Sequence, residues 1–152
     1  VQQFTKEGHL RWDSLGEFMA LAVSLEHYGR KNNSPRARIL GNALDQATEK
    51  FLEENKSPSR KVGELDTRGS HFFLALYWAE ALADQDEDAD LKSLFREISE
   101  SLSRASETIS GELLEAQGTP QEIGGYYLPD AEKVARAMRP SRTFNEILDR
   151  IG

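Results

Sequence analysis

The sequence predicts an all-α protein, a multi-helix bundle built around one buried central helix. Apolar residues recur at steps of three and four along most of the 152 residues, which is the period of helices that bury one face. No stretch alternates apolar and polar residues for long enough to build a sheet. The segment "HFFLALYWAEALA", residues 71–83, is apolar on nearly all sides. Such a segment is typical of a helix at the centre of a bundle.

The first helix is expected at about residues 14–28. Ser14 and Glu17 have the spacing of a capping box at its start, and Gly29 is a stop signal at its end. Its apolar stripe consists of Leu15, Phe18, Met19, Ala22 and Leu25.

The second helix is expected at about 35–54, with Ser34 as its cap and Pro35 at its first position. Its inward face consists of Ile39, Leu40, Ala43, Leu44, Ala47 and Phe51. A loop punctuated by proline and glycine follows at 55–70. Beyond the central helix, we expect one long helix at 90–117, a turn at "IGGYYLPD" (123–130) and short helices near 130–138 and 143–150.

Composition excludes several classes of function. The net charge is −7, and duplex nucleic acid requires a basic face, so we expect no nucleic-acid partner. Cysteine is absent, which removes disulfides and cysteine-bound zinc. No apolar run is long enough to cross a bilayer, and no signal peptide precedes Val1. We therefore expect a cytoplasmic protein without membrane contact, and the initial Val in place of Met suggests a piece of a longer polypeptide.

Basic residues are expected to gather at one end of the bundle. Helices of about 15 and 20 residues are roughly 22 and 30 Å long, and the short link between them favours an antiparallel pair. The loop at 55–70 then returns to the end that carries Arg11 and the start of the first helix. That loop supplies Arg60, Lys61 and Arg68. Arginine forks and helix amino ends both bind phosphate, so this end is a candidate site for a phosphate-bearing ligand.

Each candidate has an alternative interpretation. A lone arginine such as Arg11 is more often solvated, and the second arginine 49 residues later makes the two interpretations about equal. Trp12 is either a packing residue or a platform for a base. Asp13 is either the cap of the helix, an acceptor for a ligand hydroxyl or amino group, or a group that orients Arg11. No general acid, general base and metal site occur together, so the residues alone do not make a complete enzyme.

Long strings of the sequence resemble one known family. "VQQFTKEGHLRWDSLGEFMALAVSLEH", "SPSRKVGELDTRGSHFFLALYWAEALA", "IGGYYLPD" and "AMRPSRTFNEIL" are similar to the carboxyl-terminal part of monomeric-type NADP-dependent isocitrate dehydrogenase, in order and over essentially the whole chain. The resemblance implies a bacterial cytoplasmic enzyme of the citric acid cycle that converts isocitrate to 2-oxoglutarate and carbon dioxide with NADP and Mg²⁺ or Mn²⁺. It also implies that residues 1–152 form a single helical domain, the C-terminal helical part of a larger α/β cofactor-binding domain.

The resemblance assigns this chain half of a cofactor site. Arg11, Trp12 and Asp13 in "LRWDSLG" and Arg60 in "SPSRKVG" match family positions that hold the adenosine end of NADP, where the arginines clamp the 2′-phosphate. The catalytic and metal-binding residues of the family lie upstream, so none is expected here. The chain is then inactive alone and has the remainder of a monomeric enzyme as its partner. The alternative is a free-standing helical module for protein interaction or nucleotide sensing, which should lack a large exposed apolar patch.

Overall fold

The computed structural model describes residues 2–125 and 127–151. Within these ranges it contains helices and connecting loops and no strand, so the all-α prediction is confirmed. The helices are α1 (Gln2–Glu7), α2 (Leu15–Lys31), α3 (Pro35–Glu53), α4 (Thr67–Asp84), α5 (Ala89–Arg104), α6 (Ser106–Glu115), α7 (Ala131–Met138) and α8 (Arg142–Leu148).

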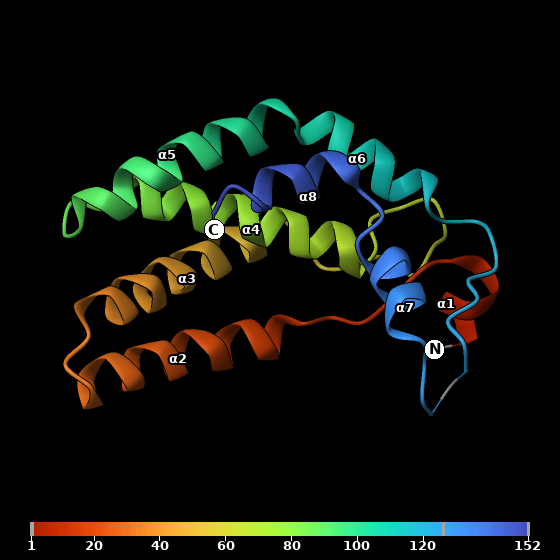
Figure 1. The fold of residues 1–152 in the computed structure, drawn as a ribbon, viewed down its shortest axis with the longest axis horizontal. Coiled ribbons are helices and arrows are strands. Elements are labelled where there is room, and N and C mark those ends of the chain that lie inside the picture. The colour runs from red at the N-terminus through yellow and green to blue at the C-terminus, as the bar shows by residue number, and fades with distance from the viewer. Residues whose placement is uncertain (1, 126, 152) are drawn as a thin grey trace.

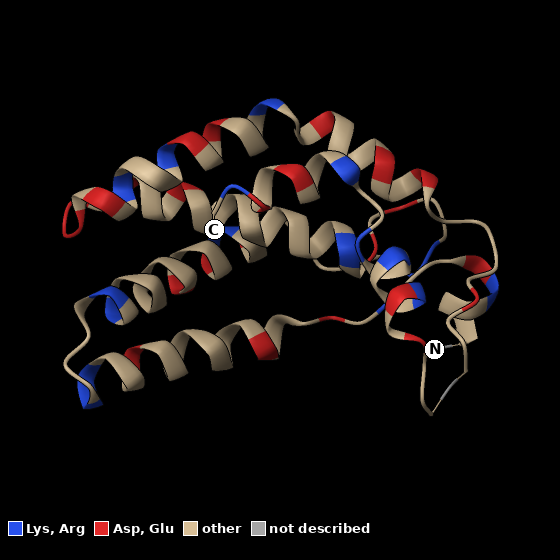
Figure 2. Ribbon diagram, viewed as in Figure 1, with Lys and Arg blue, Asp and Glu red and all other residues tan. Residues whose placement is uncertain are grey.

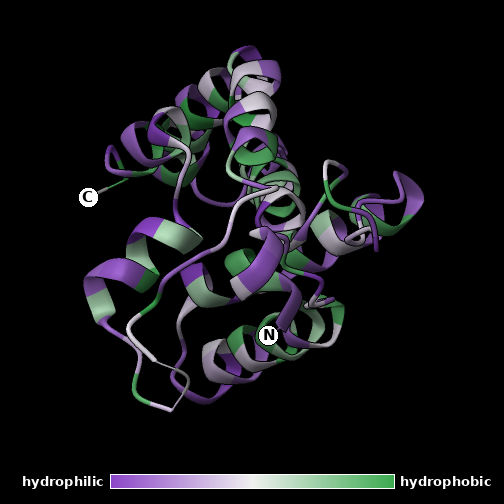
Figure 3. Ribbon diagram, turned by 90° about the vertical axis from the view of Figure 1, so that its right-hand side faces the viewer, coloured by the Kyte–Doolittle hydropathy of each residue, from purple (hydrophilic) through white to green (hydrophobic). Residues whose placement is uncertain are grey.

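The long helices form a bundle, and the short helices and loops gather at one end of it (Figure 1). α2 and α3 make an antiparallel hairpin, α4 lies against α3, and α5 runs back along α4. α8 packs against both α5 and α6. Hydrophilic and hydrophobic residues alternate along the helices (Figure 3), as expected when each helix buries one face.

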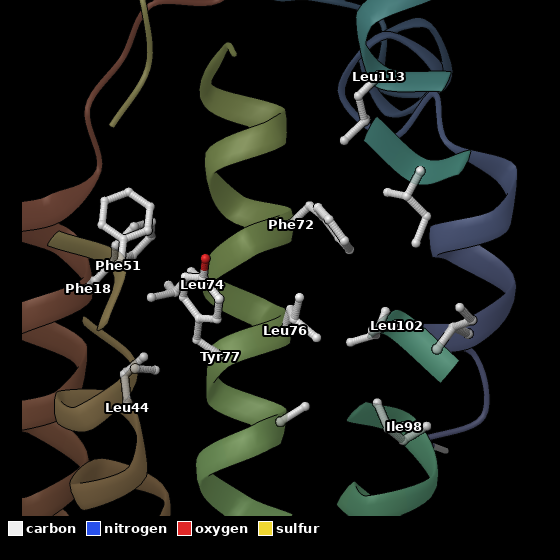
Figure 4. Close-up of a cluster of buried hydrophobic side chains, with 14 of the residues drawn as sticks. Phe18, Leu44, Phe51, Phe72, Leu74, Leu76, Tyr77, Ile98, Leu102 and Leu113 are labelled. Atoms are coloured by element: carbon white, nitrogen blue, oxygen red, sulfur yellow. The ribbon is translucent and has the colours of Figure 1, made fainter. Parts of the chain in front are cut away.

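The buried central helix is α4, as the apolar run at 71–83 predicts. Phe72 is completely buried, and the core side chains approach α4 from two sides (Figure 4). One side contributes Phe18, Leu44 and Phe51 from α2 and α3, and the other contributes Ile98, Leu102 and Leu113 from α5 and α6. Burying one such side chain stabilises the fold by about 1.5–3 kcal/mol, so α4 is the element to which the other helices attach.

The first helix differs from its prediction at its end and on one face. Gly29 does not stop α2, which continues to Lys31. A Cβ at Gly29 would lie 2.9 Å from the backbone nitrogen of Arg38 and 3.0 Å from the carbonyl of Ser34. The absence of a side chain at Gly29 therefore allows the start of α3 to pack closely against α2. Met19, expected in the apolar stripe, is exposed, because α3 and α4 cover only the side of α2 that carries Phe18 and Ala22.

The other helix boundaries are mostly close to those predicted. Ser34 accepts a hydrogen bond from the nitrogen of Ala37, as the predicted cap of α3 should. α4 begins at Thr67, several residues earlier than predicted, because Asp66 caps it. The long helix expected at 90–117 is divided at Ala105 into α5 and α6, although backbone hydrogen bonds continue across the bend.

The carboxyl-terminal third largely follows the prediction, and the amino terminus does not. Both short helices are present as α7 and α8. The turn at 123–130 is closed by a hydrogen bond from the nitrogen of Asp130 to the carbonyl of Ile123, although Tyr126 within it lies outside the described residues. The periodicity gave no indication of α1, a helix of only 6 residues.

Candidate functional site

The segment that carries Arg11 is an extended strap, residues 8–14, laid across the amino end of α4. The nitrogen of Thr67 donates to the carbonyl of Leu10 at 2.8 Å. The hydroxyl of Thr67 accepts from the nitrogen of Trp12, also at 2.8 Å, and the nitrogen of Leu10 donates to the Asp66 carboxylate at 3.3 Å. The backbone on both sides of Arg11 is therefore fixed to one helix end.

The Arg60 loop, residues 54–66 between α3 and α4, is attached to the same strap. Within the loop, the nitrogen of Ser59 donates a hydrogen bond to the carbonyl of Leu65. The carbonyl of Arg60 accepts from the Gln3 side chain at 3.2 Å, and the carbonyl of Ser59 lies 2.9 Å from Nε2 of His9. The predicted meeting of the strap and the loop at one end of the bundle is therefore confirmed.

His9 and Gln117 form the buried link between these segments. His9 is fully buried, and its Nδ1 lies 2.7 Å from Oε1 of Gln117. Gln117, at the end of α6, also accepts from the nitrogen of Gly63 at 2.8 Å and donates to the carbonyl of Glu64 at 2.9 Å. One glutamine thus joins the strap to the Arg60 loop.

Arg68 is not part of an open positive surface, contrary to the sequence prediction. Its side chain is 2% exposed and pairs with Asp66 at 2.7 Å. It also donates to the carbonyls of Gly8 and Ala137, so the guanidinium is neutralised and ties the strap and α7 to α4. Isolated charge is too costly to bury, which is why Asp66, itself 1% exposed, accompanies it.

Lys61 is also balanced by an acidic partner. Its Nζ lies 3.5 Å from Glu64. A hydrogen bond from the Ser59 hydroxyl, with a smaller contribution from the Lys61 charge, lowers the pKa of Glu64. Figure 2 shows basic and acidic residues interspersed at this end of the molecule.

Arg11 and Arg60, the two arginines that the sequence predicts to bind phosphate, both keep an open guanidinium, as does Arg136 on α7. Both are exposed, and within the described part of the chain neither guanidinium has a hydrogen-bond or ion-pair partner. Arg11 lines a groove of about 600 Å³, together with Gln3, Trp12 and His71. Gln3 also binds the carbonyl of Arg60, so the loop that carries Arg60 adjoins one wall of this groove.

Trp12 and Asp13 complete the set of predicted site residues. Trp12 is 61% exposed, which rules out a core-packing role and leaves its ring open to solvent beside Arg11. Its Nε1 donates to Glu17 at 3.1 Å. The capping box of Ser14 and Glu17 is wrong: Ser14 makes no side-chain cap hydrogen bond, and Asp13 accepts from the nitrogen of Leu15 at 3.1 Å instead.

The described residues contain no cluster of three or more His, Cys, Asp or Glu side chains that could hold a metal ion. A divalent cation such as Mg²⁺ prefers several oxygen ligands, so the described residues by themselves do not form a site for the metal of the family. No helix in the described ranges has the length and apolar character needed to span a bilayer.

Comparison with known proteins identifies the family. Residues 1–149 match the family described as monomeric isocitrate dehydrogenase. The chain is 57% identical over 148 residues to isocitrate dehydrogenase (NADP) of Azotobacter vinelandii, covering 97% of this chain and 20% of that protein. Isocitrate dehydrogenase (NADP) 2 of Mycobacterium tuberculosis is 50% identical over 151 residues, which are 99% of this chain and 20% of its own.

A third relative, isocitrate dehydrogenase (NADP) 2 of Colwellia maris, is also 57% identical, over 97% of this chain and 20% of its own. The protein is thus a helical chain that is similar over nearly its whole length to part of these isocitrate dehydrogenases. It belongs to the monomeric isocitrate dehydrogenase family, and it spans about a fifth of the length of the relatives it matches.

The sequence did not indicate the buried polar residues that hold the site together. His9 is one of three isolated histidines in the sequence, and Gln117 belongs to no recognisable pattern. The one available signal for Asp66 was its place directly before Thr67, which is the position of a helix cap. His9 and Gln117 are separated by 108 residues, so no local pattern could pair them.

Proposed function

We propose that this chain is the C-terminal part of an NADP-dependent isocitrate dehydrogenase of the bacterial cytoplasm, and that it holds the adenosine 2′-phosphate of NADP. In this proposal Arg11 and Arg60 bind the phosphate, Trp12 lies beside the adenine, and Asp13 accepts a hydrogen bond from the adenosine or orients Arg11. Residues 1–152 act as one helical unit of the cofactor-binding domain. The remainder of the polypeptide supplies the isocitrate site, the catalytic residues and the Mg²⁺ or Mn²⁺ ligands.

The observation that carries the proposal is a pair of arginines that lack acidic partners and lie on two segments joined by hydrogen bonds. Arg68 and Lys61 have acidic partners, whereas Arg11 and Arg60 have open guanidiniums on a strap and a loop that are tied together. A guanidinium can bind a phosphate through two parallel hydrogen bonds, and fixed backbones reduce the entropy lost on binding. The names of the relatives include NADP, the cofactor that carries this extra phosphate.

The proposal predicts selectivity between the two nicotinamide cofactors, since NAD lacks the 2′-phosphate. Charge-assisted hydrogen bonds contribute about 1.5–3 kcal/mol each. Two of them give a preference for NADP of roughly 10²–10⁴-fold, before solvent exposure reduces it.

The test is Arg60→Ala in the full-length polypeptide that carries this chain. We expect the KM for NADP to rise at least about tenfold and the KM for NAD to stay within about twofold. Arg96→Ala is the matched control, because Arg96 is exposed on α5 away from the strap and the loop. Equal rises for both cofactors in Arg60→Ala would refute the 2′-phosphate role.

Exposed apolar side chains on α2 support the proposal that the chain works within a longer polypeptide. Met19, Leu21, Val23 and Tyr28 are between 45% and 64% exposed. Their spacing places Met19 and Val23 on one side of the helix and Leu21 and Tyr28 on the other. Exposed apolar surface of this kind is typical of an interface. We propose that the remainder of the enzyme covers these side chains, which disfavours the free-standing module. The chain expressed alone should then show no turnover of isocitrate, and activity in a preparation free of the longer enzyme would contradict this.

A further inference from the structure

We propose that His9 and Gln117 are positioning residues that set the placement of Arg60 relative to Arg11, and thereby the selectivity for the 2′-phosphate. The inference rests on the proposed function and extends it to two side chains that touch no ligand. His9 belongs to the strap that carries Arg11, and its Nε2 binds the carbonyl of Ser59, the residue before Arg60. Gln117 binds His9 and two further residues of the Arg60 loop.

The contacts of His9 engage both of its ring nitrogens. The amide of Gln117 has a fixed orientation, because Oε1 accepts from the nitrogen of Gly63 and Nε2 donates to the carbonyl of Glu64. Nδ1 of His9 therefore faces an oxygen at 2.7 Å, and Nε2 faces the Ser59 carbonyl at 2.9 Å. The buried ring thus lies between Gln117 on one side and the Arg60 loop on the other, which fixes its position.

Few other contacts hold the Arg60 loop to the rest of the protein. The Arg60 loop is exposed from Arg60 to Glu64, so apolar packing does not fix it. Apart from Gln3, which binds the carbonyl of Arg60, the described contacts that hold residues 59–64 to other segments are those of His9 and Gln117. Hydrogen bonds are directional, which suits a link that must hold a binding loop in one place.

The test compares two substitutions of Gln117 in the full-length polypeptide. Gln117→Leu removes all three hydrogen bonds of the side chain. Gln117→Glu keeps an acceptor for His9 and for the nitrogen of Gly63, and replaces the donation to the carbonyl of Glu64 by a contact between two oxygens. The readout is the ratio of dissociation constants of 5′-AMP and 2′,5′-ADP, measured by calorimetry, because the two probes differ only in the 2′-phosphate.

We expect Gln117→Leu to reduce this ratio at least about tenfold, since a binding group displaced by 1 Å can cost up to about a hundredfold. Gln117→Glu should keep the ratio within about threefold of the wild type. Leu102→Ala, a core change on α5, is the control for lost stability: it should lower the unfolding temperature and leave the ratio unchanged.

The possible failures can be told apart. A wild-type ratio near one would refute the proposed function, and this inference with it. A high wild-type ratio that Gln117→Leu leaves unchanged would overturn the positioning role alone. If Gln117→Leu does not fold, Gln117→Asn decides the point, because the shorter amide cannot reach His9 and the Arg60 loop together: a ratio equal to that of the wild type in this variant would overturn the inference.

Discussion

Two regions of this molecule are held together by different forces. The bundle, made of α2–α6 and α8, is stabilised by apolar side chains around α4 (Figure 4). The loop end, made of α1, the strap, the Arg60 loop, the first turn of α4, residues 116–130 and α7, is held mainly by buried polar groups. Its fully or nearly fully buried side chains include His9, Asp66 and Arg68, each of which bonds a segment distant in sequence.

The difference shows how a small helical chain combines a robust scaffold with a specific site. Apolar contacts are non-directional, so the bundle tolerates small changes in the shape of a side chain. Hydrogen bonds between buried polar groups are directional, and a donor or acceptor left unpaired costs about 1–3 kcal/mol. The open arginines are therefore carried by segments that directional hydrogen bonds join to one another and to α4.

The largest effect should follow from breaking the buried ion pair of the loop end. Asp66→Ala leaves the Arg68 guanidinium without its counter-charge. It also removes the cap of α4 and the acceptor for the nitrogen of Leu10. We expect a loss of about 3–5 kcal/mol in the free energy of unfolding, measured by denaturant titration.

The double substitution Asp66→Asn with Arg68→Met is the matched control. It removes both charges and keeps an acceptor at the cap of α4, so it should be less destabilising than Asp66→Ala alone. A loss below about 1 kcal/mol for Asp66→Ala would place it within the range of surface ion pairs. The loop end would then not depend on this pair.

The sequence predicted the bundle well and the loop end poorly, for the same physical reason. Phe72, Leu102 and their neighbours follow a local period that can be recognised without a structure. His9 and Gln117 are 108 residues apart. The sequence does not show whether a polar side chain is buried and hydrogen-bonded or exposed to solvent. Arg68 shows the consequence, because its charge was counted as open and is neutralised by Asp66. Arg11 and Arg60 were placed correctly at one end because their position depends only on helix length and direction.

A smaller effect is expected at Glu112, which joins α6 to the start of α8 within the bundle. Hydrogen bonds from the hydroxyls of Ser141 and Thr143 lower the pKa of this carboxylate below its ordinary value of 4.5. Because the folded pKa is the lower one, the contribution to stability is complete above about pH 4.5 and is lost as the pH falls through the folded value.

Glu112→Gln should therefore destabilise the protein by about 1–2 kcal/mol at neutral pH, and the difference from the wild type should shrink at acid pH. Denaturant titrations of both proteins between pH 3 and pH 7 provide the measurement. A difference that stays constant over this range would show that the charge of Glu112 contributes nothing.

The smallest effects compare the caps of two adjacent helices, one correctly predicted and one not. Ser34 accepts from the nitrogen of Ala37 at the start of α3, so Ser34→Ala should cost about 1 kcal/mol. At the start of α2 the cap hydrogen bond belongs to Asp13 rather than Ser14, so Asp13→Ala should cost about 0.5–1 kcal/mol and Ser14→Ala less than either. Thermal unfolding of the three variants distinguishes these values. If Ser14→Ala were the most destabilising, the capping box expected from the sequence would form in solution, and Asp13 would be free to face the cofactor.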